Sequence, residues 1–313
     1  MNSPLGTQLA TAFPQLKFME EELLSGHTYS KIGGPAEVFV RLYERKDFED
    51  LVVFCRKHSI ELTMLGGGSN VLIADAGIRG LVIKNLTKHY EVKVGENSGT
   101  IEVDSGLPTN VIVRASVDAG LEGLEKFLGL PGSVGGAVYN NSHFSGKDLI
   151  GNVVKTVHLI DATGEKVMRT RDEMEYAYDY SILQKTHEVI IWVEFELPKG
   201  DKVQLEKTML EVTRHRATTQ PLGIPSSGCM FKNALMPDGT KQSAGFLIDK
   251  AGLKGMKVGD AMVSPVHANF IVNTGHATQE QVEKLAQKVE AVIKEKFGVE
   301  LHREVFRLGN TVN

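Results

Sequence analysis

Glycine is the feature that most constrains how this chain can fold. Its 32 glycines gather in a few short stretches instead of being spread evenly. One cluster, residues 65–70 (LGGGSN), lies between two apolar stretches that are typical of strands. Backbone without side chains can approach a ligand closely, and Ser69 and Asn70 add donors suited to a diphosphate. Taken alone, a structural turn explains this cluster equally well.

A second cluster, residues 130–137 (LPGSVGGA), is harder to explain as a simple connection. It joins Pro131, whose φ is fixed, to three glycines and a serine within an apolar stretch. Two such loops can approach a flat ring and its phosphate tail from two sides, so we predict a cofactor cradle. The predicted contacts are Gly66, Gly67, Gly68, Ser69, Asn70, Pro131, Gly132, Ser133, Gly135 and Gly136.

The segments around these loops predict an α+β chain. Runs of β-branched residues bounded by turn formers predict strands at 36–42, 60–65, 80–83, 100–103 and 153–160. Apolar residues at helical spacing predict helices at 46–58, 109–119, 203–216, 243–251 and 278–297. Strands and helices do not alternate regularly and no dinucleotide fingerprint opens a helix, which disfavours a Rossmann domain. The charged turn 198–202 (PKGDK) is the best linker candidate.

The amino-acid composition excludes some classes of binding partner and some locations. With 35 basic and 39 acidic residues, the net charge of −4 gives no general attraction to nucleic acid. No stretch approaches the roughly 20 apolar residues that a membrane helix needs, and the first residues lack a secretory pattern, so we expect a cytoplasmic protein. Cys55 and Cys229 are too few for a disulfide framework and lack a metal-binding spacing, so we expect reduced thiols and no metal.

Three motifs together carry a family resemblance. Residues 29–36 (YSKIGGPA), the block LGGGSNVLI and the block GLEGLEKFLGLPGSVGGAVYNN occur in this order along the chain. In order and spacing they resemble the UDP-N-acetylenolpyruvoylglucosamine reductases, which belong to bacterial peptidoglycan precursor synthesis. The span 197–214 leaves no room for a tyrosine-bearing insertion, so the chain is similar to the shorter subclass.

The resemblance implies a fold and a reaction. The expected fold is the two-sub-domain FAD-binding fold of the vanillyl-alcohol oxidase type, at 1–84 and 85–201, followed by an α+β substrate-binding domain at 202–313. The last strand of that domain is a candidate for return to the FAD-binding part. The implied cofactor is non-covalent FAD, with NADPH as co-substrate and a nucleotide sugar as substrate. We expect a monomer.

The back third carries the candidate catalytic residues. Residues 216–233 form a dense polar run in which Pro and Gly fix the backbone around Cys229. The resemblance implies that Cys229 stands where the family has a proton-donating serine, and that Glu304 stabilises the developing enolic acid. A thiol is the more acidic group, so the replacement is chemically tolerable. The alternatives are a small buried hydrophobic residue for Cys229 and a surface partner of Arg303 or Arg307 for Glu304.

Other polar residues are candidates for substrate binding. Lys232 and Asn233 suit an anionic, hydrogen-bonding ligand, and Arg216 is a possible source of positive charge. His267 is a candidate for contact with the nucleotide or sugar, as is Asn269, although a hydrogen-bonded core histidine is an equally good interpretation. We assign neither a proton-transfer role.

The chain also departs from the family pattern. Asp179 stands in Tyr178-Asp179-Tyr180-Ser181 where the resemblance implies an arginine that holds the substrate carboxylate. Thr219 and Val266 replace two expected lysines. These changes keep two alternatives open: a flavin oxidase of the same fold, and a non-catalytic descendant that binds a nucleotide sugar or flavin. Retention of both Cys229 and Glu304 favours the enzyme.

Overall fold

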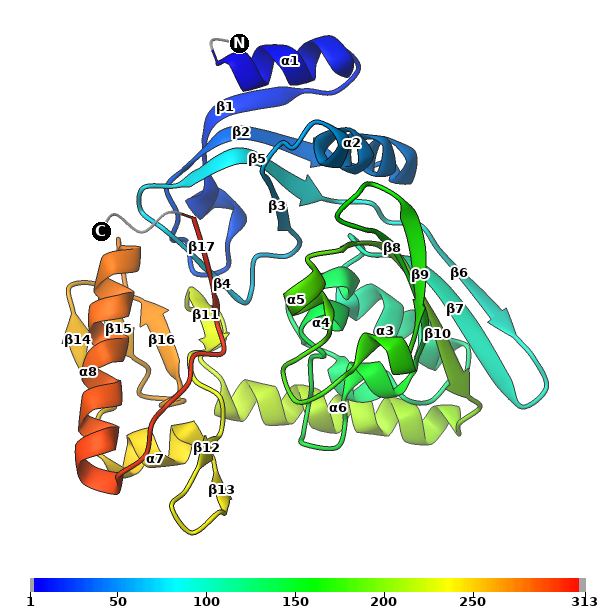
Figure 1. Ribbon diagram of the computed structural model, residues 1–313. Helices are drawn as coiled ribbons and strands as arrows, with labels where there is room; N and C mark the ends of the chain where they lie inside the picture. Colours follow the sequence, from blue (N-terminus) through cyan, green and yellow to red (C-terminus); the bar gives the residue numbers. More distant parts are fainter. Residues whose placement is uncertain (1–2, 310–313) are drawn as a thin grey trace. The chain divides into compact units, whose positions relative to one another are not determined.

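The computed structural model describes residues 3–309, which form two compact units (Figure 1). The first unit comprises residues 3–20, Val38–Gly67 and Gly80–His215. The second comprises Glu21–Glu37, Gly68–Arg79 and residues 216–309. The chain therefore passes between the units several times, and the three-part division at 84/85 and 201/202 stays a prediction about sub-domains.

The first unit is built around a five-stranded antiparallel sheet of order β6-β7-β10-β8-β9. Its strands are β6 (Tyr90–Val94), β7 (Ser98–Asp104), β8 (Val154–Ile160), β9 (Lys166–Thr170) and β10 (Val189–Pro198). Its helices are α1 (Pro4–Ala12), α2 (Arg45–Lys57), α3 (Thr109–Asp118), α4 (Val134–Tyr139) and α5 (Leu183–Thr186), with short 3₁₀ turns at Glu125–Phe127, Ile150–Asn152 and Asp172–Met174.

The central strand β10 contributes to a hydrophobic cluster on each face of this sheet. Ile190, Val193 and Phe195 join the cluster that contains the buried faces of α3 and α4, whereas Val189 and Ile191 join the one that contains α2. Strict alternation would not place Ile190 and Val193 in the same cluster. A register shift between Ile190 and Trp192 accounts for it, because a bulge exchanges the two faces of a strand.

A second sheet has the order β1-β2-β5-β3. Its strands are β1 (Phe18–Leu23), β2 (Pro35–Leu42), β3 (Leu62–Leu65) and β5 (Ile78–Asn85). Strand β3 pairs in parallel with β5 and ends at the first glycine cluster. The long helix α6 (Lys202–Thr219) begins four residues after β10 ends, so the predicted linker 198–202 is a short connection within the first unit.

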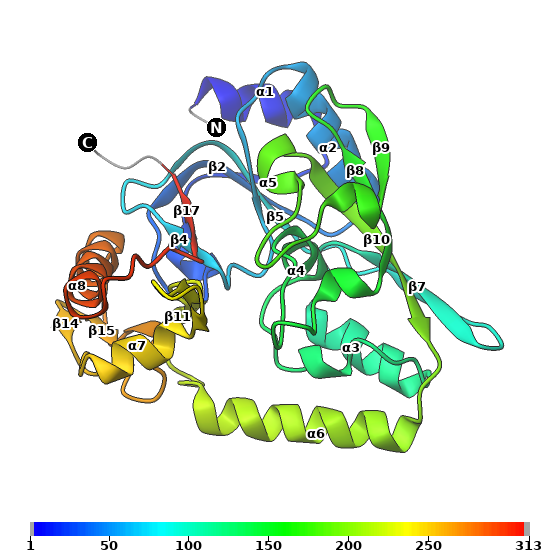
Figure 2. The ribbon, with the colours of Figure 1, turned by 60° about the horizontal axis from the view of Figure 1, so that its bottom comes forward.

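The second unit has a sheet of order β11-β16-β15-β14 and a parallel pair, β17 with β4. Its elements are a 3₁₀ turn (Leu24–His27), β4 (Val71–Ile73), β11 (Ser226–Cys229), β12 (Ala234–Leu235), β13 (Lys241–Gln242), α7 (Ala244–Lys250), β14 (Lys257–Val258), β15 (Ala261–Val263), β16 (Phe270–Asn273), α8 (Gln279–Phe297) and β17 (Phe306–Leu308). Helix α8 lies against β14 and β15 (Figure 2). The hydrophobic core of the second unit also includes Ile32 and Leu72, which come from much earlier in the sequence.

The α+β prediction is confirmed, and each predicted strand and helix occurs within a few residues of its predicted bounds. The sequence patterns missed several elements, among them the N-terminal helix α1 and the central strand β10. In addition, residues 134–137 of the second glycine cluster begin helix α4 instead of forming a loop. No helix in the described part of the chain combines the length and apolar character needed to cross a membrane.

Candidate active site

The two glycine clusters touch each other inside the first unit. A Cβ added to Gly66 would overlap the Ser133 hydroxyl, and one added to Gly67 would overlap the Cα of Gly132. The close approach of the two loops therefore depends on glycine at Gly66 and Gly67. This contact supports the predicted pairing of the loops, although the roles of their residues in cofactor binding stay predictions.

Three backbone hydrogen bonds hold the second loop in place. The amide of Thr109 donates to the Gly132 carbonyl at 3.1 Å, Val134 donates to Leu107 at 2.9 Å, and Gly135 donates to Ser105 at 2.8 Å. Ser133 is the N-cap of α4, and its hydroxyl accepts from the Gly136 amide. The loop thus presents a fixed backbone with few side chains, which fits the close approach of a flat flavin ring and its diphosphate.

The rest of the first glycine cluster belongs to the second unit. Gly68 has a φ of +73° and lies against the backbone of His27, so only glycine fits there without strain. The Gly68 carbonyl accepts from the Tyr29 amide at 2.9 Å, and the Asn70 carbonyl accepts from Phe306 at 3.1 Å. The cluster is thus divided after Gly67, and Ser69 and Asn70 stay predicted cofactor contacts.

Cys229 ends strand β11 in the second unit and is half-buried. The preceding Gly228 has a φ of +81°, and the Ser227 hydroxyl donates to the Val71 carbonyl at 2.9 Å. The next amide, that of Met230, donates to Asn269 at 2.7 Å. By contrast, Cys55 is completely buried in α2, and burial raises the pKa of its thiol to about 12. Of these two cysteines, Cys229 is therefore the one whose thiol is accessible for a reaction.

Backbone pairing brings the Cys229 segment beside the Glu304 segment. The Glu304 amide donates to the Met230 carbonyl at 2.9 Å, and the Lys232 amide donates to His302 at 2.8 Å. Glu304 itself is half-buried. Strand β17 begins only at Phe306, so Glu304 lies just before it, and the preceding Arg303 forms an isolated bridge with Phe231.

Arg303 and Arg307 have carboxylate partners on α8. The Arg303 guanidinium lies 2.6 Å from Glu290 and 3.5 Å from Glu283, and Arg307 lies 3.3 Å from Glu283. The charges of both arginines are thus accounted for without Glu304.

Arg216, near the end of α6, is electrostatically coupled to Cys229. Its side chain is buried, and burial lowers the pKa of the guanidinium while the nearby Cys229 acts in the opposite direction. Arg216 is thus a positively charged group in the surroundings of Cys229. Lys232 is half-buried and Asn233 is exposed, so both are accessible to a ligand within this unit.

Asn269 has a structural role that the sequence did not reveal. Its side-chain oxygen accepts from the Phe231 amide at 3.0 Å and its nitrogen donates to the Phe231 carbonyl at 2.8 Å. These bonds position the chain directly after Cys229. His267 packs on Phe270 with ring centroids 4.8 Å apart, and burial lowers the pKa of its imidazole. Its Nδ1 accepts from the Asn269 amide, so His267 is at least partly structural.

Asp179, the residue at the expected arginine position, is almost completely buried in the first unit. One carboxylate oxygen lies 3.1 Å from Nδ1 of His143. The sequence drew no attention to His143, because 36 residues separate it from Asp179 and no motif includes it. Only the fold reveals this pair.

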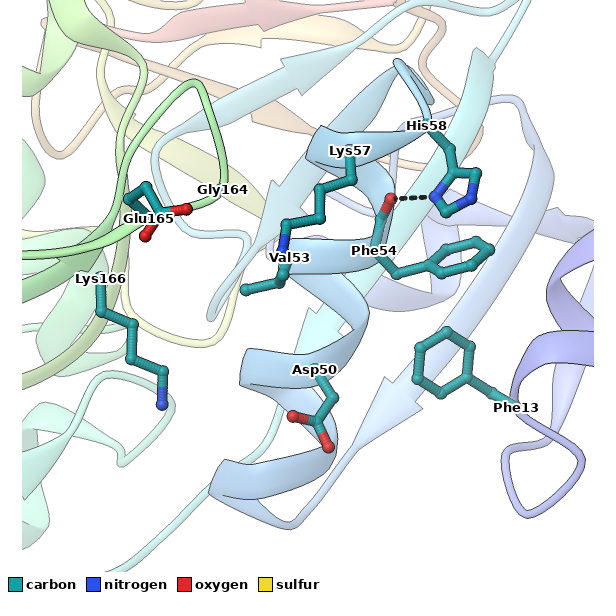
Figure 3. Close-up of a pocket in the computed structure, with 9 residues that line it drawn as sticks. All are labelled: Phe13, Asp50, Val53, Phe54, Lys57, His58, Gly164, Glu165 and Lys166. Atoms are coloured by element: carbon teal, nitrogen blue, oxygen red, sulfur yellow. Dashed lines mark hydrogen bonds between the residues drawn. The ribbon is translucent and has the colours of Figure 1, made fainter.

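A surface cavity of about 610 Å³ in the first unit contains none of the predicted site residues. Figure 3 shows the rings of Phe13 and Phe54 on one side and Glu165 and Lys166 on the other. Two of its charged groups have neighbouring partners, since Asp50 pairs with Lys46 at 2.7 Å and Lys166 pairs with Glu49.

Comparison with known proteins identifies the two parts of the chain. Residues 36–169 match the FAD binding domain family, and residues 220–308 match the C-terminal domain of UDP-N-acetylenolpyruvoylglucosamine reductase. A reductase of that name from Lachnoclostridium phytofermentans is 37% identical over 315 residues, covering all of both chains. One from Enterococcus faecalis is 37% identical over 298 residues, covering 95% of this chain and 96% of the relative.

A solved structure agrees. The crystal structure of UDP-N-acetylenolpyruvylglucosamine reductase from Thermus caldophilus has a TM-score of 0.78 at 32% identity, covering 94% of this chain and 99% of that one. The predicted FAD-dependent reductase fold is confirmed. The chain belongs to the UDP-N-acetylenolpyruvoylglucosamine reductase family and is an FAD-dependent oxidoreductase.

Proposed function

We propose that this chain reduces UDP-N-acetylglucosamine enolpyruvate to UDP-N-acetylmuramate, and that Cys229 and Glu304 carry the proton chemistry. NADPH is the hydride source, and FAD, when bound, carries that hydride to the enolpyruvyl β-carbon. These assignments are supported by the hydrogen bond from the Glu304 amide to the Met230 carbonyl, because it joins the segment that contains Cys229 to the segment that contains Glu304. The residues that we propose to hold FAD are those of the two glycine clusters.

Cys229 donates the proton in this proposal. Hydride addition to the β-carbon leaves negative charge on the adjacent α-carbon, and the Cys229 thiol transfers its proton to that carbon. The charge of Arg216 stabilises the thiolate that remains. A thiol has a reference pKa near 8.5, far below that of an aliphatic hydroxyl, so cysteine is the stronger acid at this position.

In this proposal Glu304 stabilises the negative charge that reaches the substrate carboxylate. The negative charge that follows hydride addition spreads into the substrate carboxylate, so a nearby donor lowers the barrier. A protonated Glu304 supplies that donor. Lys232, Asn233, Arg216 and His267 are the proposed contacts with the nucleotide sugar. Of these, Lys232 and Arg216 bring positive charge suited to a diphosphate.

The test is anaerobic turnover with defined reactants. We expect oxidation of NADPH beyond one equivalent per flavin only when UDP-N-acetylglucosamine enolpyruvate is present, and a product that has gained two hydrogens by mass spectrometry. In a parallel run in air, oxidation of NADPH by oxygen with the enolpyruvyl sugar recovered unchanged would contradict the proposal. That outcome would favour the oxidase alternative.

We also propose that the chain works as a cytoplasmic monomer. Its two cysteines are free, which suits a reducing compartment. Light scattering after gel filtration should give a mass near 34.3 kDa plus one flavin. A mass near twice that value at micromolar concentration would contradict the monomer.

A further inference from the structure

Ser105 is a buried serine at which three chain segments of the first unit meet. It directly follows β7 and is 4% exposed. Its amide donates to the Ile191 carbonyl at 3.0 Å, and its carbonyl accepts from the Gly135 amide at 2.8 Å. Through these two bonds Ser105 joins the central strand β10 to the second glycine cluster.

The hydroxyl of Ser105 is bonded on both sides. It donates to the Ile190 carbonyl at 2.6 Å and accepts from the side-chain amide of Asn85 at 2.8 Å. Asn85 is a buried residue at the end of β5, and its side-chain oxygen accepts from the Thr87 amide at 3.1 Å. Because buried polar groups are costly to leave without partners, these bonds hold the hydroxyl in one orientation.

The bulge in β10 explains why a hydroxyl is useful at this point. The register of β10 against β8 shifts between Ile190 and Trp192. A bulge interrupts the regular ladder of backbone hydrogen bonds. The Ile190 carbonyl lies at this interruption, and the Ser105 hydroxyl supplies it with a donor. Alanine at position 105 would remove one buried bond from the Ile190 carbonyl and one from the Asn85 amide.

The second glycine cluster packs directly on this junction. A Cβ added to Gly135 would lie 2.8 Å from the Cβ of Ser105. A Cβ added to Gly106 would lie 2.6 Å from the side-chain oxygen of Asn85. The glycine backbones are therefore in contact with Ser105 and Asn85. Since a closely packed interior transmits displacements, a shift of Ser105 also moves Gly135.

We propose that Ser105 is a positioning residue for the flavin and acts through Gly135. Its hydroxyl, held by Asn85 and the Ile190 carbonyl, fixes the main-chain carbonyl that binds the Gly135 amide. The second glycine cluster is thereby ordered before FAD arrives, which removes part of the ordering cost of binding. This inference rests on the proposed role of that cluster as a flavin contact.

Two measurements on Ser105→Ala test this role. The FAD dissociation constant, measured by fluorescence titration, should rise about 10-fold, a usual consequence of leaving buried polar partners unsatisfied. In the FAD-free full chain, hydrogen–deuterium exchange should become about 10-fold faster in peptides that cover residues 130–137, because this segment opens more often. Peptides from α2 should exchange at the parent rate.

Ser116→Ala is the matched control for a general loss of stability. Ser116 is completely buried, and its hydroxyl donates to the Val113 carbonyl at 2.9 Å within α3. The variant thus also loses a buried serine hydroxyl and should have a lower melting temperature. It should keep the FAD dissociation constant, and the exchange of residues 130–137, within about twofold of the parent.

Asn85→Leu is a second variant that keeps the inference testable if Ser105→Ala folds poorly. It removes the donor to the Ser105 hydroxyl and leaves the second glycine cluster unchanged, so it should also weaken FAD binding. Added to Ser105→Ala, it should have less than its separate effect, since both act through one hydroxyl.

The contrary results are distinct from a failure of the proposed function. An FAD dissociation constant and an exchange rate that match the parent in both Ser105→Ala and Asn85→Leu would overturn the inference. Equal changes in Ser105→Ala and Ser116→Ala would overturn it as well, because Ser105 would then contribute only to stability. If the parent chain itself binds no FAD, the proposed function fails instead.

Discussion

At the scale of single residues, the proposal depends on the different environments of two cysteines. Cys55 is a completely buried residue of α2, and burial raises the pKa of its thiol to about 12. Cys229 is half-buried at the end of β11, next to a glycine in left-handed conformation and coupled to Arg216. Only the second environment can support a proton donor that is regenerated in each cycle.

Replacing Cys229 with alanine should separate the two half-reactions. Reduction of FAD by NADPH needs no proton from this residue, so its rate should stay within about twofold. Reoxidation by the enolpyruvyl sugar should slow about 100- to 10,000-fold, the usual contribution of a general acid. Stopped-flow absorbance at the flavin band measures both rates. Cys229→Ser should keep measurable reoxidation, and Cys55→Ala should match the parent. Normal reoxidation in the alanine variant would remove Cys229 from the mechanism.

The Glu304→Gln variant tests whether Glu304 stabilises the negative charge that reaches the substrate carboxylate. Glutamine keeps the shape and one donor, but it cannot share a proton with the developing acid. Because the proton is no longer shared, the oxidative half-reaction should slow about 100- to 1,000-fold, the usual cost of losing one stabilising group, while FAD binding stays normal. Glu280→Gln is the control, since Glu280 pairs with Lys284 on the exposed face of α8. If both variants reoxidise at the parent rate, Glu304 is a surface residue.

At the scale of elements, Arg303 ties the candidate catalytic segments to α8. Its guanidinium binds Glu290 and Glu283, contacts the Met230 sulfur at 3.4 Å and covers the Phe231 ring at 5.2 Å. Successive side chains in an extended segment point to opposite sides. Arg303 directed towards α8 therefore turns the neighbouring Glu304 away from α8.

Arg303→Met should slow the oxidative half-reaction without affecting FAD reduction. Arg307→Met is the matched control because Arg307 also pairs with Glu283 but is half-exposed. A mere loss of packing would lower the melting temperature and leave the rate unchanged, which would contradict a positioning role. Glu290→Gln should have a smaller effect when added to Arg303→Met than alone, since the two groups act as one pair.

The contact between the glycine loops gives a second prediction at this scale. Gly67→Ala forces a methyl group into the backbone of Gly132, so the loops must separate and FAD retention should be lost. Gly146→Ala, where a Cβ meets nothing within 4 Å, should keep its flavin. Absorbance near the flavin band after gel filtration measures the bound fraction. Full flavin content in Gly67→Ala would show that loop contact is unnecessary.

At the scale of the whole molecule, local patterns predicted the elements but not their assembly. Apolar spacing located α2, α3, α7 and α8 because each buries one face in a core. The pairing of β17 with β4, and of Met230 with Glu304, joins positions far apart in sequence. No local signal encodes such pairings. Asp179 was noticed as a departure, yet its partner His143 emerged only from the fold.

The central claim is most directly tested by one anaerobic titration of the purified protein. FAD-loaded protein should be yellow, lose its flavin absorbance on addition of one equivalent of NADPH, and regain it on addition of one equivalent of UDP-N-acetylglucosamine enolpyruvate. UDP-N-acetylglucosamine, which has no double bond to reduce, should leave the bleached spectrum unchanged. A colourless protein that cannot be reconstituted with FAD, or a reduced flavin that the enolpyruvyl sugar fails to reoxidise, would contradict the account.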